Sequence, residues 1–226
     1  MKKERLKQII KGIIIFILFY LSSYIQLIPI YLFKLDISKL DGTSKVALST
    51  FSNIVLLIIL ILIYRKELYK EWKIFKDNLY ANIDLGFKYW SIGLIVMFIS
   101  NIFINIVLKN GQAANEQAVQ EMITYAPLLM VLNAGIIAPI IEELTFRKAF
   151  KNMFNKKWVF ILTSGIIFGA LHVVTSITSI IDLLYIIPYS SLGIAFAYMY
   201  YKTDTVYTPI SMHMIHNTIL TIISII

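Results

Sequence analysis

Seven long apolar runs constrain this chain more than any other feature of its sequence. Each has about 20 residues, the length that an α-helix needs to cross the hydrocarbon core of a bilayer. Only 15% of the 226 residues are charged and 58% are hydrophobic, which is far from the balance of a soluble domain. The sequence therefore predicts an all-α polytopic membrane protein, a bundle of about seven transmembrane helices with six to eight possible. The runs are Ile9–Phe33, Val46–Tyr64, Leu85–Leu108, Ile123–Ile141, Trp158–Thr175, Ile177–Tyr200 and Val206–Ile226.

The distribution of Lys and Arg over the connecting segments predicts the orientation of the bundle. With the N-terminus in the cytoplasm, 17 of the 21 basic residues fall on the cytoplasmic side and 4 on the other. Such a bias is typical of loops that face the cytoplasm. We therefore expect a multi-pass protein of the cell membrane with a cytoplasmic N-terminus. The net charge of +8 then reflects topology and contact with membrane lipid, and no nucleic-acid partner is expected.

Two further features narrow the possibilities. The chain has no cysteine, which excludes disulfide frameworks, Cys zinc sites and thiol catalysis. The polar stretch Arg65–Asp84 mixes Lys with aromatic residues, and it is either an amphipathic helix on the inner surface or a solvated loop.

Charged side chains close to the end of the fourth run are the first candidates for chemistry. Inserting an ionisable side chain into the bilayer costs on the order of 2.5–3.5 kcal/mol on insertion scales, so such a residue usually has a function. Glu143 and Arg147 are four positions apart and can pair on one helix face. Glu142 points about 100° away and lacks that partner, which suits a carboxylate that acts as a general base. The alternative is that the three residues merely mark the cytoplasmic end of the helix.

All three histidines lie in the last 55 residues. His172 is well inside the fifth run, where it is either a satisfied core residue or a catalytic group. In the seventh run His213 and Asn217 are four positions apart and share a helix face. Asn217 alone would be read as a helix-packing residue. His216 lies on nearly the same side as His213, and we assign it a structural or supporting role.

Three separate apolar helices thus carry groups that take up or donate protons. Helices in lipid bury such groups toward one another, so Glu142, His172, His213 and Asn217 are expected to converge in one cavity. That set contains a base, a positioning imidazole and oxyanion donors, as needed for attack of a water on a carbonyl. The sequence contains no Gly-x-Ser-Gly, His-Glu-x-x-His or Gly-x-Gly-Asp motif of other membrane proteases.

The order of these motifs resembles a known family. Glu142-Glu143-x-x-x-Arg147, Phe168-x-x-x-His172 and His213-x-x-x-Asn217 together resemble the CAAX-protease and bacteriocin-processing (CPBP, or Abi) family of intramembrane endopeptidases. The resemblance covers about Asn133 to Thr218. It implies an all-helical bundle with the motifs in a cavity open toward the cytoplasm. It also implies a division into an N-terminal membrane region, 1–122, with three spans and no motif, and a catalytic region, 123–226.

Carried over residue by residue, the resemblance implies that Glu142 and His172 activate the water and that His213 and Asn217 stabilise the oxyanion. Glu143 and Arg147 would support the site or hold the substrate end. Members of the family have been labelled metalloproteases, and Glu142, His172 and His213 could form a zinc site. If Glu142 bound the metal, it could not easily also act as the free base. Glu143 would then have to be the base, and its pairing with Arg147 argues against that role. We favour a site without a metal or other cofactor, with zinc as the alternative.

The predicted function is that of an intramembrane endopeptidase acting on a membrane-associated peptide or protein, in bacteriocin self-immunity or peptide processing. One alternative is a non-catalytic membrane immunity or scaffold protein of the same fold. Another is a proton-coupled transporter, which the lack of a repeat between the halves of the chain disfavours. The sequence identifies neither the substrate and its cleavage site nor the oligomeric state.

Overall fold

A computed structural model describes residues 2–108, 113–177 and 179–226. Every regular element in these ranges is helical, which confirms the predicted all-α class. The α-helices are α1 (Lys2–Leu21), α2 (Leu27–Leu32), α3 (Gly42–Asp77), α4 (Leu79–Leu108), α5 (Ala114–Tyr125), α6 (Pro127–Met130), α7 (Ala138–Glu142), α8 (Phe150–Met153), α9 (Lys157–Val174), α10 (Ile186–Thr203) and α11 (Tyr207–Ile223). Three 3₁₀ segments, η1 (Ser22–Gln26), η2 (Ile37–Lys39) and η5 (Ile180–Tyr185), and two π segments, η3 (Val131–Ile137) and η4 (Glu143–Ala149), connect or interrupt them.

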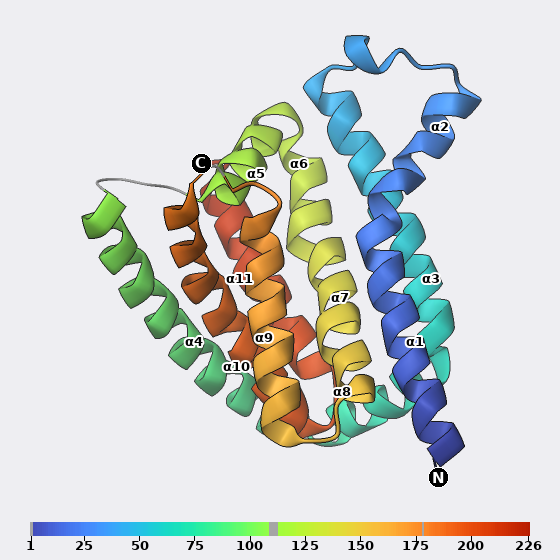
Figure 1. Cartoon of the computed structure of the whole chain (residues 1–226), viewed down its shortest axis with the longest axis vertical. Coiled ribbons are helices and arrows are strands. Elements are labelled where there is room, and N and C mark those ends of the chain that lie inside the picture. The colour runs from blue at the N-terminus through green and yellow to red at the C-terminus, as the bar shows by residue number, and fades with distance from the viewer. Residues whose placement is uncertain (1, 109–112, 178) are drawn as a thin grey trace.

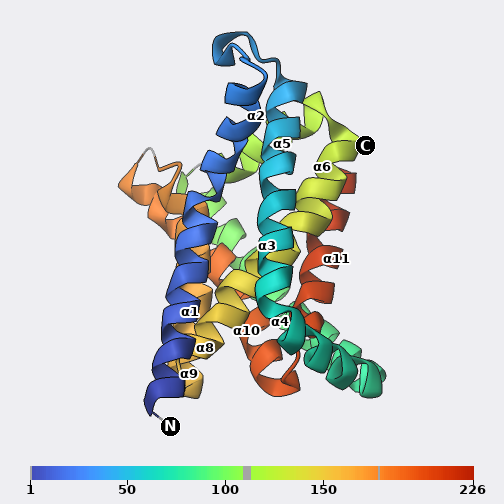
Figure 2. The ribbon, with the colours of Figure 1, turned by 90° about the vertical axis from the view of Figure 1, so that its right-hand side faces the viewer.

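Six helical stretches of the described chain are long and apolar enough to cross a membrane, and they correspond to the first six predicted runs. The seventh run forms α11, whose 17 residues rise about 26 Å, slightly less than the ~30 Å of a hydrocarbon core. α11 still runs along the bundle and brings the C-terminus to the end opposite the N-terminus (Figures 1 and 2). The outer surface carries large exposed apolar side chains such as Ile95, Phe98 and Ile106, as lipid contact requires.

The fourth span extends further than the sequence analysis predicted. Its helical stretch runs from Pro127 to Met153 instead of ending at Ile141. Leu144, Phe146 and Phe150 are buried and continue the apolar pattern beyond the acidic pair. Glu142 and Glu143 therefore lie within this helical stretch, about three turns before its end.

Small residues allow α9 and α10 to pack closely. A Cβ added at Gly165 or Gly169 would lie 2.6 Å from a backbone nitrogen of α10, which leaves no room for a side chain at either position. The two glycines are four residues apart and form the small-x-x-x-small pattern common between membrane helices. This contact fixes the position of α9, which carries His172 near its end.

Helix α3 is longer than a membrane core. Its 36 residues rise about 54 Å, and they include most of the stretch predicted as either an amphipathic helix or a loop. Leu68 and Phe75 are buried in this part, whereas Lys70 and Lys73 are exposed, as in an amphipathic helix. Its last turns reach the end of the bundle at which α8 ends and α11 begins (Figures 1 and 2).

Candidate active site

Glu143 and Arg147 form an ion pair in the interior of the molecule. Both lie in η4 and both side chains are fully buried, with Arg147 Nε 3.0 Å from Glu143 Oε2. The guanidinium also donates to Ser164 Oγ of α9 over 3.1 Å, and it lies 4.6 Å from the centroid of the Phe168 ring. A buried ion pair needs such additional partners to offset the hydration that both charges have lost. The predicted Glu143–Arg147 pair is thus present, and it ties η4 to α9.

His213 of α11 lies between two neighbouring carboxylates. Its Nδ1 is 2.9 Å from Glu143 Oε1, and its Nε2 is 3.6 Å from Glu142 Oε2. The ionised carboxylate of Glu143 only accepts hydrogen bonds, so Nδ1 of His213 carries the hydrogen and donates it. The imidazole is also stacked on Phe196, with the ring centroids 4.8 Å apart. These contacts hold His213 in one orientation, with Nε2 on the side of Glu142.

His172 is fixed by its own helix. Its Nδ1 lies 2.8 Å from the backbone oxygen of Phe168, one turn earlier in α9. Because a carbonyl oxygen accepts, Nδ1 donates, and Nε2 of the neutral ring keeps a free lone pair. The ring also stacks on Tyr189 of α10, at 4.9 Å between centroids. His172 therefore presents a proton-accepting nitrogen in a defined direction.

Glu142 and His172 line the same cavity, which has a volume of about 420 Å³. Glu142 Oε2 is buried and makes no hydrogen bond within the described chain, since its 3.6 Å separation from His213 Nε2 exceeds hydrogen-bond length. The Glu142 side chain is 16% exposed, so part of it reaches the cavity while Oε2 is buried on the side of His213. The other lining residues come from α1, η1, α5, η4, α9 and its C-terminal end: Phe19, Tyr20, Ser23, Tyr24, Asn115, Phe146, Leu171 and Thr175.

None of the predicted residues of α11, His213 included, is among those that line this cavity. Asn217 donates from Nδ2 to the backbone oxygen of Ala134 over 3.0 Å, and Thr218 donates to that of Gly135 over 3.1 Å. Both acceptors belong to η3, where the π winding changes the usual backbone pairing. Asn217 is therefore engaged in holding α11 against η3 and is not among the residues that line the cavity. His216 is buried, with its ring 6.4 Å from that of Trp90 on α4.

The residues proposed for a zinc site do not form a ligand cluster. No group of three or more His, Asp or Glu in the described ranges is arranged so that it could hold a metal ion. We derive no step through a metal, and a site without one stays a prediction.

Several residues of the site were not found by sequence reasoning. Ser164 bonds Arg147 and Phe196 stacks on His213, yet each is an ordinary residue of an apolar run. Ser164 could have been noticed as a hydroxyl two helical turns before His172. The wall formed by Tyr20 and Tyr24 carries no such signal, because it depends on the packing of α1 against a distant part of the chain.

Fold and site together define a polytopic membrane protein with a carboxylate–imidazole site within its helices. Residues 124–219 match a family model described as type II CAAX prenyl endopeptidase Rce1-like. A relative from Bacillus subtilis (strain 168), named "Putative membrane peptidase YdiL", is 29% identical over 184 residues, which are 78% of this chain and 71% of the relative. No solved structure matches. These findings confirm the resemblance to the CAAX-protease family and support a membrane protease at the family level.

Proposed function

We propose that this protein is an intramembrane endopeptidase that hydrolyses a peptide bond with a water activated by Glu142 and His172. The observation that carries the proposal is that Glu142, whose side chain is 16% exposed, lines the same cavity as His172 and that its buried Oε2 has no hydrogen-bond partner in the described chain. A base must reach the proton that it removes, directly or through one water, and a cavity of this size admits both a water and a peptide segment.

The reaction follows from the groups around the cavity. The water oxygen bonds to the carbonyl carbon of the scissile amide while the Glu142 carboxylate takes up its proton and Nε2 of His172 accepts its second O–H. The carbonyl electrons move onto oxygen and form the oxyanion. When that oxyanion collapses, the C–N bond breaks and Glu142 passes the proton to the leaving nitrogen. The products are a carboxyl and an amino terminus.

The proposed oxyanion donors place a condition on His213. With Nδ1–H donated to Glu143, Nε2 of a neutral ring has no hydrogen to give, so His213 serves as a donor only as an imidazolium. In the proposal Glu143 orients this ring and Arg147 holds Glu143. Asn217 supports the position of α11 through its hydrogen bond to Ala134.

The chemistry of the cavity wall supports a peptide as the substrate. Tyr20, Ser23, Tyr24 and Thr175 bring hydroxyl groups to the wall, and Asn115 brings an amide. Such groups can pair with the backbone of an extended peptide, which an entirely apolar cavity could not do. We propose a membrane-associated peptide or protein as the substrate, a cytoplasmic N-terminus, and a physiological setting of bacteriocin self-immunity or peptide processing.

The test compares membrane and secreted peptides from cells that express the wild type, Glu142→Gln or His172→Ala. Loss of the same cleavage products in both variants, with normal amounts of protein in the membrane, is expected. Glu4→Gln is the matched control, because Glu4 is exposed and pairs only with Lys7 on the surface. The products should also persist when a chelator is added. Cleavage retained in both variants would refute the proposal and favour a scaffold or immunity protein, and zinc-dependent rescue after chelation would overturn the metal-free site.

A further inference from the structure

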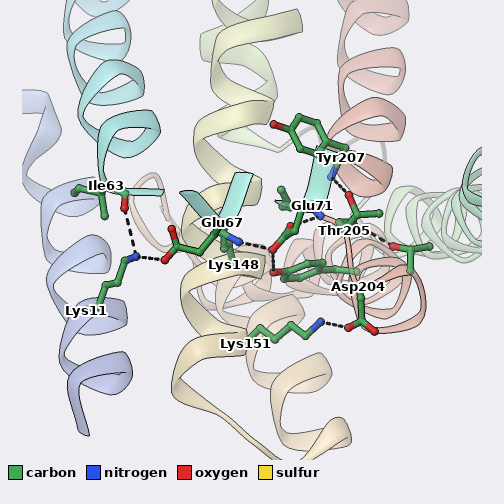
Figure 3. A network of polar contacts seen from close by, with 12 residues as sticks. Lys11, Ile63, Glu67, Glu71, Lys148, Lys151, Asp204, Thr205 and Tyr207 are labelled. Carbon is green, nitrogen blue, oxygen red and sulfur yellow. Dashed lines mark hydrogen bonds and ion pairs between the residues drawn. The ribbon is translucent and has the colours of Figure 1, made fainter. Parts of the chain in front are cut away.

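Glu71, near the end of α3, accepts hydrogen bonds from three different elements of the bundle. Its Oε1 accepts from Lys148 Nζ of η4 and from the Tyr200 hydroxyl of α10, the latter over 2.9 Å. Its Oε2 accepts from the backbone N–H of Val206 over 2.8 Å. Figure 3 shows this network at the end of the bundle. One carboxylate of the N-terminal half therefore joins η4, α10 and the start of α11.

The surroundings make a charge at position 71 necessary. The Lys148 side chain is 4% exposed and that of Glu71 13%, so the ammonium group has little access to water. Removing one partner of a buried ion pair leaves the other charge uncompensated. All three groups around Glu71 are donors, and a carboxylate is the side chain that accepts from all of them. An amide at this position would direct its own hydrogens at one of these donors.

The bond to Val206 determines where α11 begins. Val206 is the residue that precedes the first turn of α11, and its N–H is among the backbone donors that a helix start leaves free. A carboxylate placed there is also favoured by the helix dipole. His213 and Asn217 follow about two and three turns later on the same helix. A shift of the helix start would be transmitted to both residues.

We propose that Glu71 is a positioning residue of the site, which fixes the start of α11 and thereby the placement of His213 and Asn217. Its importance for cleavage rests on the proposed function, but its effect on the position of α11 does not. Glu71 lies outside the residues matched by the family model. The inference gives the N-terminal half a defined part in building the site.

A disulfide reporter tests the position of α11 directly, because the chain has no cysteine of its own. An ideal Cβ at Gly135 of η3 lies 3.5 Å from Thr218 Cβ of α11, within the roughly 3.5–4.5 Å that disulfides span. The Gly135→Cys, Thr218→Cys pair should therefore cross-link readily under mild oxidation. Adding Glu71→Gln should slow this cross-link by roughly tenfold, the effect of losing a charge-assisted hydrogen bond.

Two controls separate positioning from general destabilisation. Glu67→Gln removes the neighbouring carboxylate one turn earlier, which pairs with Lys11 of α1 over 2.7 Å, and it should leave the cross-linking rate unchanged. A second reporter, Gly93→Cys with Ala195→Cys, joins α4 to α10. The ideal Cβ at Gly93 lies 3.0 Å from Ala195 Cβ, so the two helices must separate by about 0.5 Å to reach the disulfide range. Its rate should be the same with and without Glu71→Gln.

A variant of the backbone donor completes the test. Val206 has a φ of −68°, which proline adopts, so Val206→Pro removes the N–H while Glu71 and Lys148 stay paired. It should slow the 135–218 cross-link in the same way. Unchanged cross-linking in both Glu71→Gln and Val206→Pro would overturn the proposal, as would equal slowing of both reporters. Because no readout depends on cleavage, an inactive wild type would refute the proposed function alone.

Discussion

Glu142 and Glu143 are adjacent in sequence and have opposite surroundings. Glu143 is fully buried and bonded to both Arg147 and His213, so its carboxylate is committed to holding other side chains. Glu142 lines the cavity, and its buried Oε2 has no hydrogen-bond partner in the described chain. The difference arises because consecutive helical residues point in directions about 100° apart. One residue can therefore be structural while its neighbour remains free to react.

Replacing Arg147 should show the cost of leaving Glu143 without its partner. Arg147→Met should lower the free energy of unfolding by about 3–5 kcal/mol, since it strands a buried carboxylate. Arg147→Lys should cost less, because it keeps the charge and loses the forked contact with Ser164. Thermal unfolding in detergent measures both, with Lys66→Met on the exposed side of α3 as the control. An unfolding temperature of Arg147→Met equal to that of the wild type would contradict the argument.

The spacing of residues within one helix made part of the site predictable. Glu143 and Arg147 pair because the i, i+4 interval brings them together whatever the rest of the chain does. The contact of His213 with Glu143 is different, since it depends on how α11 packs against η4. The engagement of Asn217 with Ala134 likewise depends on η3, whose π winding has no signal that we could read. Helix existence and type followed from hydropathy, whereas contacts between helices did not.

At the scale of elements, the two π segments lie on either side of α7 and make several contacts of the site. η3 provides the backbone oxygens that Asn217 and Thr218 bond, and η4 contains the Glu143–Arg147 pair. Single turns of π-helix are rare and frequent at functional sites. Here η3 offers backbone oxygens to α11, and η4 accommodates the buried Glu143–Arg147 pair.

The close contact of α9 and α10 predicts the effect of adding one methyl group. Gly169→Ala would place a Cβ 2.6 Å from Ser190 N and 2.9 Å from Ile186 O, so the helices must move apart. We expect a loss of about 1–3 kcal/mol in the free energy of unfolding and weaker proposed activity, because His172 follows three residues later. Ile166→Ala, at an exposed position of the same helix, is the control. Detergent unfolding that is unaltered by Gly169→Ala would argue against this close packing.

At the scale of the whole molecule, the cavity combines segments that are far apart in sequence. Phe19, Tyr20 and Tyr24 come from α1 and η1, whereas Glu142 and His172 come from the residues that the family model matches. Part of the wall and the two proposed reacting groups therefore belong to different parts of the chain. If the proposed function holds, changes in α1 should alter which peptide fits while the carboxylate and the imidazole stay in place.

The asymmetric distribution of basic residues predicts how the whole molecule sits in the membrane. We expect a cysteine introduced at Lys7 to react with a membrane-impermeant maleimide only after the cells are permeabilised. A cysteine at Lys39, exposed between η1 and α3, should react in intact cells. The cysteine-free parent gives the background of the assay. The reverse labelling pattern would show that the N-terminus faces outward.

The Glu71 network also has a consequence for biosynthesis. Ribosomes deliver the chain from its N-terminus, so Glu71 emerges 77 residues ahead of Lys148 and 135 residues ahead of Val206. During that interval α3 enters the membrane with a carboxylate that lacks its final partners. The Glu71 carboxylate forms its ion pair with Lys148 only after the later helices have been made. The contacts around Glu71 can therefore be completed only after the last helix has been made.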